Sequence, residues 1–259
     1  MKTNSKSLSI VALLCYILMI IMNILAVTQP LNGVETGAVS DRFYNLFTPA
    51  GFTFSIWSVI YTLLLAFVIS RIVYAFRNDN RAEPRVLSYF IISCLANAAW
   101  LVAWHNFQLW IGVAIMFLLL LSLIRVHIKG SLPRPFKPVG EKVMFDIPFS
   151  IYLGWISVAI IANVSAALVQ SEIDLGGNEE TWAVIMVIAA ALLALLLGVW
   201  RRNLFYAITI CWGLFGILKA REQEGETLIL EKVILASIGT VLLFALIRVF
   251  TSARKHRET

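Results

Sequence analysis

The sequence predicts an all-α integral membrane protein with about eight transmembrane helices. Hydrophobic residues make up 60% of the 259 residues and charged residues only 14%, whereas a soluble domain carries about 25% charged residues. The mean hydropathy is +0.85. Most of the acidic and basic residues gather in short segments between long apolar stretches. This pattern is typical of a chain that crosses a membrane repeatedly.

Eight apolar stretches are long enough, or nearly so, to cross about 30 Å of hydrocarbon as helices. They are residues 8–28, 52–75, 86–104, 108–127, 144–169, 181–199, 203–219 and 230–250. The sixth consists almost entirely of Ala, Leu, Ile and Val and gives the strongest signal, while the seventh is short. The first exceeds the apolar part of a typical signal peptide and lacks a clear cleavage pattern, so we expect it to stay as a helix.

The segments between these stretches alternate in charge. Basic residues precede the first stretch, follow the eighth, and occupy every second segment between them, whereas residues 171–181 hold four acidic residues and no Lys or Arg. The positive-inside rule therefore places both termini in the cytoplasm, in agreement with an even number of helices. We expect the location to be a bacterial plasma membrane. The net charge of +6 fits attraction to anionic lipid and needs no nucleic acid partner.

The acidic segment 171–181 also marks the best internal boundary. We expect residues 1–170 to form a five-helix bundle, and residues 171–259 to add three transmembrane helices and a cytoplasmic C-terminal tail. The first outer loop, residues 29–50, is long and holds Phe43, Tyr44 and Phe47. Aromatic residues in such a loop indicate either a lid or a set of anchors at the lipid headgroups.

Ionisable residues are informative because none lies convincingly at mid-membrane, where proton relays and ion-coupled pumps need them. Five ionisable residues inside the apolar stretches lie near predicted cytoplasmic ends, where long side chains reach the headgroups: Arg71, Arg125, His127, Asp146 and Arg248. The three cysteines have unrelated spacings, and no phosphate-binding glycine loop occurs. We therefore predict no catalytic residue, metal site or cofactor.

Polar and aromatic side chains instead gather at one depth of the membrane. Counted at 1.5 Å per helical residue, Asn23, Trp57, Asn97 and Asn163 lie roughly 8–11 Å below the predicted outer surface. A buried amide is costly unless it finds a partner. The amides could join helices through hydrogen bonds, or they could line a mostly apolar ligand cavity. We favour the cavity, because aromatic residues share the same helix faces.

These aromatic residues lie at helical spacing from the amides. Tyr61 is one turn after Trp57, Trp100 is three residues after Asn97, and Trp155 is eight residues before Asn163. The candidate ligand-binding residues are Trp57, Tyr61, Asn97, Trp100, Trp155 and Asn163.

Three stretches carry these residues in order: residues 47–61, 95–100 and 148–163. At these stretches the chain resembles the tryptophan-rich sensory protein family, which includes the mitochondrial translocator protein. The likeness covers the proline-led start of the second helix with its Trp57-x-x-x-Tyr61, the Asn97-x-x-Trp100 pattern and the fifth-helix segment. The resemblance implies a five-helix bundle whose pocket opens near the first loop and binds tetrapyrroles and other flat apolar ligands.

The chain also departs from the pattern of the family. Phe52 stands where the family usually has a Trp, and Ala167 stands where many members carry a Trp after the fifth-helix Asn. If porphyrin photochemistry depends on that Trp, this protein binds without reacting. The three C-terminal helices have no counterpart in five-helix members, and we expect them to cover a surface that those members use for dimerisation.

The leading functional hypothesis is a membrane receptor or sensor that binds a flat apolar ligand, such as a tetrapyrrole, near the outer leaflet. One alternative is a permease for a small or amphipathic solute. Another is a regulator that docks a membrane partner or a second copy of itself through the added helices or the acidic segment. Enzyme activity is the least favoured. The expected partners are the lipid bilayer and an apolar small molecule such as a porphyrin.

Overall fold

The computed structural model describes residues 2–29, 31–130, 139–173, 176, 178–225 and 228–255. No β-strand occurs in this part of the chain. Eight helices within it are long and apolar enough to cross a membrane, which confirms the predicted fold class. The spanning helices are α1 (Lys2–Thr28), α3 (Ile56–Phe76), α4 (Pro84–His105), α5 (Leu109–Gly130), α7 (Ile147–Gln170), α8 (Glu179–Leu193), α9 (Leu204–Glu224) and α10 (Leu228–Lys255).

Shorter helical segments extend several of these helices. A 3₁₀ turn, η2 (Gly51–Ser55), leads into α3, and the π-helical η4 (Ala194–Trp200) continues α8. The short helix α6 (Val139–Glu141) and the π-helical η3 (Lys142–Asp146) precede α7. The first loop contains the 3₁₀ turn η1 (Leu31–Gly33) and the helix α2 (Thr36–Arg42).

Local sequence signals explain where several helices begin and end. Pro84 and Pro148 lie in the first turns of α4 and α7, where a missing backbone N–H costs nothing. The Asn178 side chain accepts a hydrogen bond from the Thr181 N–H at 2.8 Å and caps α8. Gly225 ends α9 with φ of +77°, a left-handed conformation that glycine adopts readily.

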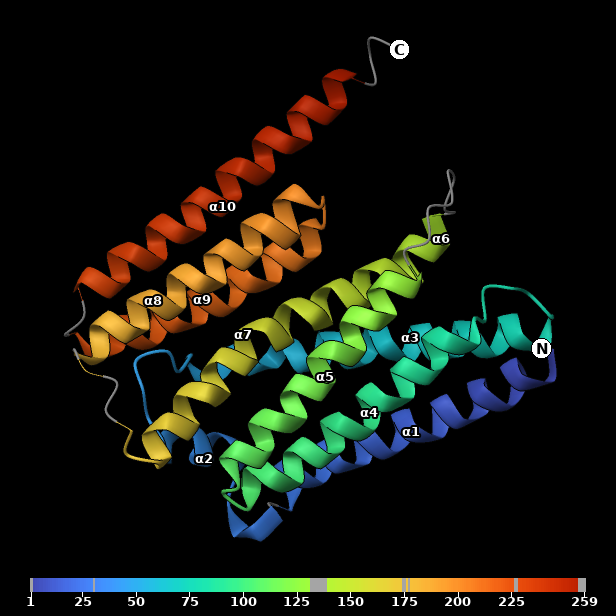
Figure 1. The fold of residues 1–259 in the computed structure, drawn as a ribbon, viewed down its shortest axis with the longest axis horizontal. Helices are drawn as coiled ribbons and strands as arrows, with labels where there is room; N and C mark the ends of the chain where they lie inside the picture. The colour runs from blue at the N-terminus through green and yellow to red at the C-terminus, as the bar shows by residue number, and fades with distance from the viewer. Residues whose placement is uncertain are drawn as a thin grey trace.

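The first five spanning helices form one bundle, and α8, α9 and α10 lie together on one side of it, with α10 farthest from α1 (Figure 1). Helix α9 makes the main contact with the bundle, against α7. Glycines allow this close approach: a Cβ added at Gly154 would lie 2.9 Å from the Tyr206 carbonyl oxygen, and one at Gly213 would lie 2.9 Å from Val158. Small residues at helix interfaces of membrane proteins serve this purpose.

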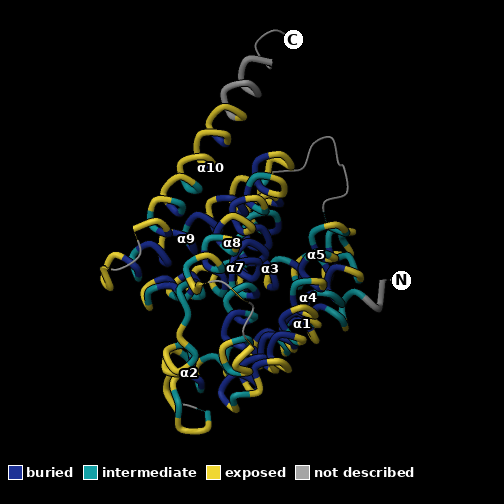
Figure 2. The backbone as a smooth tube through the Cα atoms, turned by 60° about the vertical axis from the view of Figure 1, so that its left-hand side comes forward, coloured by how far each residue is buried: buried dark blue, intermediate teal, exposed yellow. Residues whose placement is uncertain are grey.

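The outward surface of the helices is apolar. Figure 2 shows long exposed faces on α10, and α1 and α10 expose leucines such as Leu14 and Leu243 over more than half of their surface. Leucine on an outer face needs no protein partner in hydrocarbon. This surface is what a helix bundle presents to lipid.

Several loops meet at the end of the bundle that carries residues 31–50, which we call the first-loop end. The Asn32 side chain donates to the His105 carbonyl at 3.2 Å, and the Gln170 side chain donates to the Phe107 carbonyl at 2.7 Å. Figure 1 shows α2 at this end, away from the N-terminus. The first loop is therefore attached to the ends of α4 and, through them, of α7.

The expectation that Arg71 reaches the headgroups is wrong. Its side chain is only 3% exposed, and its Nη2 donates to both carboxylate oxygens of Glu141 at 3.0 and 3.1 Å. Its Nη1 donates to the Arg81 carbonyl at 2.7 Å. Helix α6 delivers the counter-charge, so the guanidinium is neutralised inside the protein instead of in water.

Candidate ligand cavity

Two adjoining cavities lie at the first-loop end of the five-helix bundle. The outer cavity has a volume of about 710 Å³ and is enclosed by α1, the first loop, α3 and α4. The inner cavity is narrower, about 50 Å³, and reaches toward α5 and α7. Both are lined by Phe54, Trp57 and Trp100, and by loop residues from Thr36 to Pro49. The shared lining shows that the wide outer cavity and the narrow inner cavity lie side by side.

All six candidate residues from the sequence lie around these two cavities. Trp57 and Trp100 line both cavities, and Tyr61 lines the outer one. Asn97, Trp155 and Asn163 line the inner one. Asn23, the fourth residue at the predicted common depth, lines the outer cavity. The helix faces inferred from spacing therefore converge in the structure.

The amides are nevertheless bonded to the protein itself. Asn23 donates to the Asn97 side-chain oxygen at 2.9 Å, and Asn97 donates to the Tyr152 hydroxyl at 3.2 Å. The Tyr61 hydroxyl donates to the Asn23 side-chain oxygen at 2.6 Å. This chain of hydrogen bonds connects α1, α3, α4 and α7. Asn97, only 1% exposed, thus holds helices together while it lines the cavity.

A second polar contact joins α4 and α7. The Trp100 indole N–H donates to the Asn163 side-chain oxygen at 2.8 Å, and Asn163 donates to the Ala159 carbonyl at 2.9 Å. Asn97 and Asn163 therefore join helices through hydrogen bonds, as one of the two interpretations from the sequence expects. The same two side chains also line the inner cavity, so the hydrogen-bonding and the cavity interpretations do not exclude each other.

Aromatic rings make up much of the remaining wall. Trp57 stacks on Tyr61 with ring centroids 5.3 Å apart and meets Tyr152 and Trp155 edge-on at 5.9 and 6.1 Å. Trp100 stacks on Trp104 at 5.6 Å. Such pairs add about 0.5–1.5 kcal/mol each beyond their buried area. The wall is therefore packed and held in place before any ligand binds.

The indole N–H of Trp155 has no hydrogen-bond partner among the described residues. The ring is only 2% exposed and lines the inner cavity. A buried donor without an acceptor costs about 1–3 kcal/mol, and such groups in native proteins call for an explanation. Protein atoms enclose this nitrogen, while other atoms of Trp155 line the inner cavity.

The electrostatic character of the lining is simple. Asp41 is the only charged residue among the described residues that line the two cavities. The uncharged polar side chains of the outer cavity are the amide of Asn23 and the hydroxyl groups of Thr28, Thr36, Ser40, Thr48, Ser58 and Tyr61. The site is therefore mostly apolar, with a few uncharged polar groups and one negative charge.

Sequence reasoning missed several residues of the site. Tyr152 is fully buried at the centre of the amide network, and its position three residues before Trp155 was the available signal. Phe54 contacts Trp155 at 5.9 Å. Phe52, in contrast, turns away from the cavity and meets Trp212 of α9 edge-on at 5.7 Å. Ala167 is buried and lines neither cavity.

Comparisons with known proteins place the chain in a family. Neither the curated proteins nor the solved structures contain a match to it. The profile of the family described as TSPO-like protein matches residues 9–250. This range runs from α1 into α10 and so includes part or all of every spanning helix, and it agrees with the resemblance seen at the Trp57, Asn97 and Trp155 stretches. The chain belongs to the TSPO-like protein family.

Proposed function

We propose that this protein is a membrane receptor for a flat, mostly apolar ligand of the tetrapyrrole class, held in the outer cavity with one edge in the inner one. Membership of the TSPO-like family supports a sensing or ligand-binding role. The observation that carries the proposal is the pair of adjoining cavities that share an aromatic lining of Phe54, Trp57 and Trp100, with Trp155 on the inner one.

The lining suits such a ligand in three ways. A volume of about 710 Å³ lies within the range of small-molecule pockets, which are mostly apolar with a few placed polar groups. The rings of Trp57 and Trp100 border both cavities and offer faces on which a flat ring system stacks. The hydrogen-bonded amides fix these walls, and a fixed wall lowers the ordering cost of binding.

The charge of the lining adds a preference among flat ligands. Asp41 repels carboxylates, and no Lys or Arg stands among the described lining residues. A porphyrin that carries two carboxylates must therefore direct them away from Asp41 to the mouth. Its neutral dimethyl ester avoids this repulsion, and we expect it to bind more tightly.

The test is a titration of the purified protein in nanodiscs with protoporphyrin dimethyl ester and with the free acid, followed by tryptophan fluorescence. Saturable quenching, tighter for the ester, is the expected result. Trp155→Phe should weaken binding with little loss of thermal stability. Trp110→Phe is the matched control, because the Trp110 indole N–H bonds to Ser171 on the exposed surface. Quenching that stays linear in both ligands and equal in both variants would overturn the proposal.

We also infer that the cavity mouth faces the outer side of the membrane, with both termini in the cytoplasm. The distribution of basic residues supports this orientation. A cysteine introduced at Ser40 should react with a membrane-impermeant maleimide in intact cells, above the background of the three native cysteines. Reaction only after the membrane is opened would reverse the assignment.

A further inference from the structure

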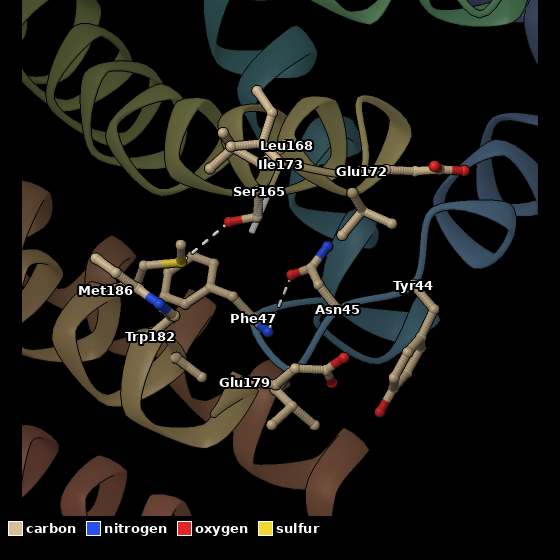
Figure 3. A pocket seen from close by; sticks show the side chains of 13 residues that line it. Tyr44, Asn45, Phe47, Ser165, Leu168, Glu172, Ile173, Glu179, Trp182 and Met186 are labelled. Atoms are coloured by element: carbon tan, nitrogen blue, oxygen red, sulfur yellow. Dashed lines mark hydrogen bonds between the residues drawn. The ribbon is translucent and has the colours of Figure 1, made fainter. Parts of the chain in front are cut away.

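A third cavity, of about 360 Å³, lies between α7, α8 and the first loop and shares only Asn45 with the lining of the inner cavity. Figure 3 shows the side chains of these three segments around the cavity, with the Glu172 carboxylate directed away from Trp182 and Met186. The loop supplies Tyr44, Asn45, Leu46 and Phe47; the end of α7 and the residues after it supply Ser165, Leu168, Val169, Glu172 and Ile173; and α8 supplies Glu179, Trp182, Ala183 and Met186. The cavity exists only because α8 stands beside α7.

The deeper wall of this cavity is apolar and aromatic. Phe47 is 1% exposed, and it lies beside Trp182 and Met186 in Figure 3. The polar atoms of this wall are already bonded: the Ser165 hydroxyl donates to the Ile161 carbonyl at 2.9 Å, and the Trp182 N–H donates to the Gly176 carbonyl at 2.6 Å. This wall therefore suits an apolar group and offers little to a polar one.

The rim carries two carboxylates, Glu172 and Glu179. Neither has a hydrogen bond or an ion pair among the described residues, whereas nearby Glu180 accepts from the Leu230 N–H at 3.1 Å and Glu224 pairs with Arg221 at 2.7 Å. In the view of Figure 3, the Glu179 carboxylate extends into the space between Phe47 and Tyr44. No Lys or Arg is among the described lining residues.

Charge and shape together restrict the ligand. Two carboxylates disfavour an anion, and a neutral apolar molecule would desolvate them without compensation. A calcium ion takes six to eight oxygen ligands, and a cavity with Trp, Phe, Met and Leu on its walls does not offer them. An ammonium or pyridinium group is attracted both by carboxylates and by the faces of aromatic rings.

We propose that this cavity binds an amphipathic organic cation. The positive group lies at the rim near Glu179 and Glu172, and the apolar part packs against Phe47, Trp182 and Met186. The proposal does not depend on the tetrapyrrole site, because none of these five residues lines the other two cavities.

The probe is a fluorescent cation, 4-(4-dimethylaminostyryl)-N-methylpyridinium, titrated against the full chain in phosphatidylcholine nanodiscs. Its uncharged analogue without the N-methyl group, measured at pH 8.5, reports binding that does not depend on charge. We expect saturable binding of the cation and at least tenfold weaker binding of the analogue. If the wild-type protein bound the cation and the uncharged analogue equally well, this result alone would overturn the proposal.

Variants then locate the site. Glu172→Gln/Glu179→Gln should lower the affinity for the cation by about tenfold or more, the size of one charge-assisted contact. Glu35→Gln/Glu231→Gln removes the same two charges from residues that line none of the three cavities and should leave the affinity unchanged. Trp182→Leu should also weaken binding, whereas Trp155→Phe should not. Equal affinity in the two double variants would place the cation elsewhere and refute the assignment.

Discussion

Arg221 of α9 donates a hydrogen bond from its Nη1 to the hydroxyl of Tyr44 in the first loop. The same hydroxyl donates to Glu224 at 2.5 Å, and Arg221 is only 1% exposed. Two further contacts lie nearby: the Ala50 N–H donates to the Gly216 carbonyl at 3.0 Å, and the Trp212 N–H donates to the Thr53 carbonyl at 3.0 Å. Helix α9 thereby positions the loop and the start of α3, although no described α9 residue lines the outer or inner cavity.

The contact between Arg221 and Tyr44 predicts that α9 controls the mobility of the loop. Arg221→Met keeps the buried aliphatic part but removes the hydrogen bonds to Tyr44 and Glu224, at a cost of about 1–3 kcal/mol. Hydrogen exchange at residues 43–55 should speed up, and porphyrin affinity should fall. Lys219→Met is the control, because Lys219 pairs with Glu222 on the exposed surface. Unchanged exchange in the Arg221 variant would contradict this role.

The Tyr44 hydroxyl also predicts a pH dependence. Burial raises the pKa of Tyr44 above its ordinary value, and the hydrogen bond to Glu224 raises it further, against an opposing effect of Arg221. Because the pKa is higher in the folded state, the stabilisation is complete below the unfolded pKa of about 10. It is lost as the pH rises through the folded pKa. The difference in Tm between the wild type and Tyr44→Phe should therefore stay constant from pH 7 to about 9.5 and shrink at higher pH. A difference that stays constant at every pH would show that ionisation of Tyr44 does not affect stability.

The buried pair of Arg71 and Glu141 predicts an asymmetric response to mutation. Glu141→Gln leaves a buried guanidinium without its counter-charge and should destabilise the protein by about 3–5 kcal/mol. The double variant Arg71→Met/Glu141→Leu removes both charges and should recover most of that loss. Denaturation in mixed micelles measures both. Glu222→Gln, which breaks an exposed pair, should cost no more than about 1 kcal/mol, and equal losses for Glu141→Gln and Glu222→Gln would show that burial does not matter here.

Asn97 predicts a joint loss of stability and binding. Asn97→Ala removes the donor to the buried Tyr152 hydroxyl, at about 1–3 kcal/mol, and one of the two acceptors of the half-buried Asn23 amide, which keeps its bond to the Met19 carbonyl. Tyr61→Phe keeps the stack on Trp57 and removes only one donor, so it should cost about 0.5–1.5 kcal/mol. Thermal unfolding of both variants, with and without the porphyrin ester, separates these effects. Full stability in Asn97→Ala would mean that the network does not join the helices.

The sequence predicted the features that are set within a single helix, namely its length, its depth and its inward face. Hydropathy predicted the eight spans, and spacing predicted that Trp57, Asn97 and Asn163 occupy one depth on inward faces. It could not predict which groups bond to one another, since helix rotation is set by packing. The pair of Arg71 and Glu141 and the contact of Tyr44 with Arg221 join residues that are 70 and 177 positions apart. No periodicity within one helix reports such contacts.

The close contact between Gly216 and Thr53 predicts that a single methyl group on α9 disturbs the cavity from outside. A Cβ added at Gly216 would lie 2.0 Å from the Thr53 hydroxyl oxygen, so Gly216→Ala must push η2 away from α9 and shift the start of α3, which carries Trp57. Such overpacking typically costs about 1–3 kcal/mol, and we expect porphyrin affinity to fall with stability.

Two variants sharpen this test. Gly239→Ala makes the same change on α10, where an added Cβ meets nothing within 4 Å, and it should leave binding and Tm unchanged. Thr53→Ala removes the two closest atoms of the clash, so Gly216→Ala/Thr53→Ala should regain part of the affinity. If Gly216→Ala binds the ester as the wild type does, then η2 can move without moving Trp57, and α9 does not set the shape of the cavity.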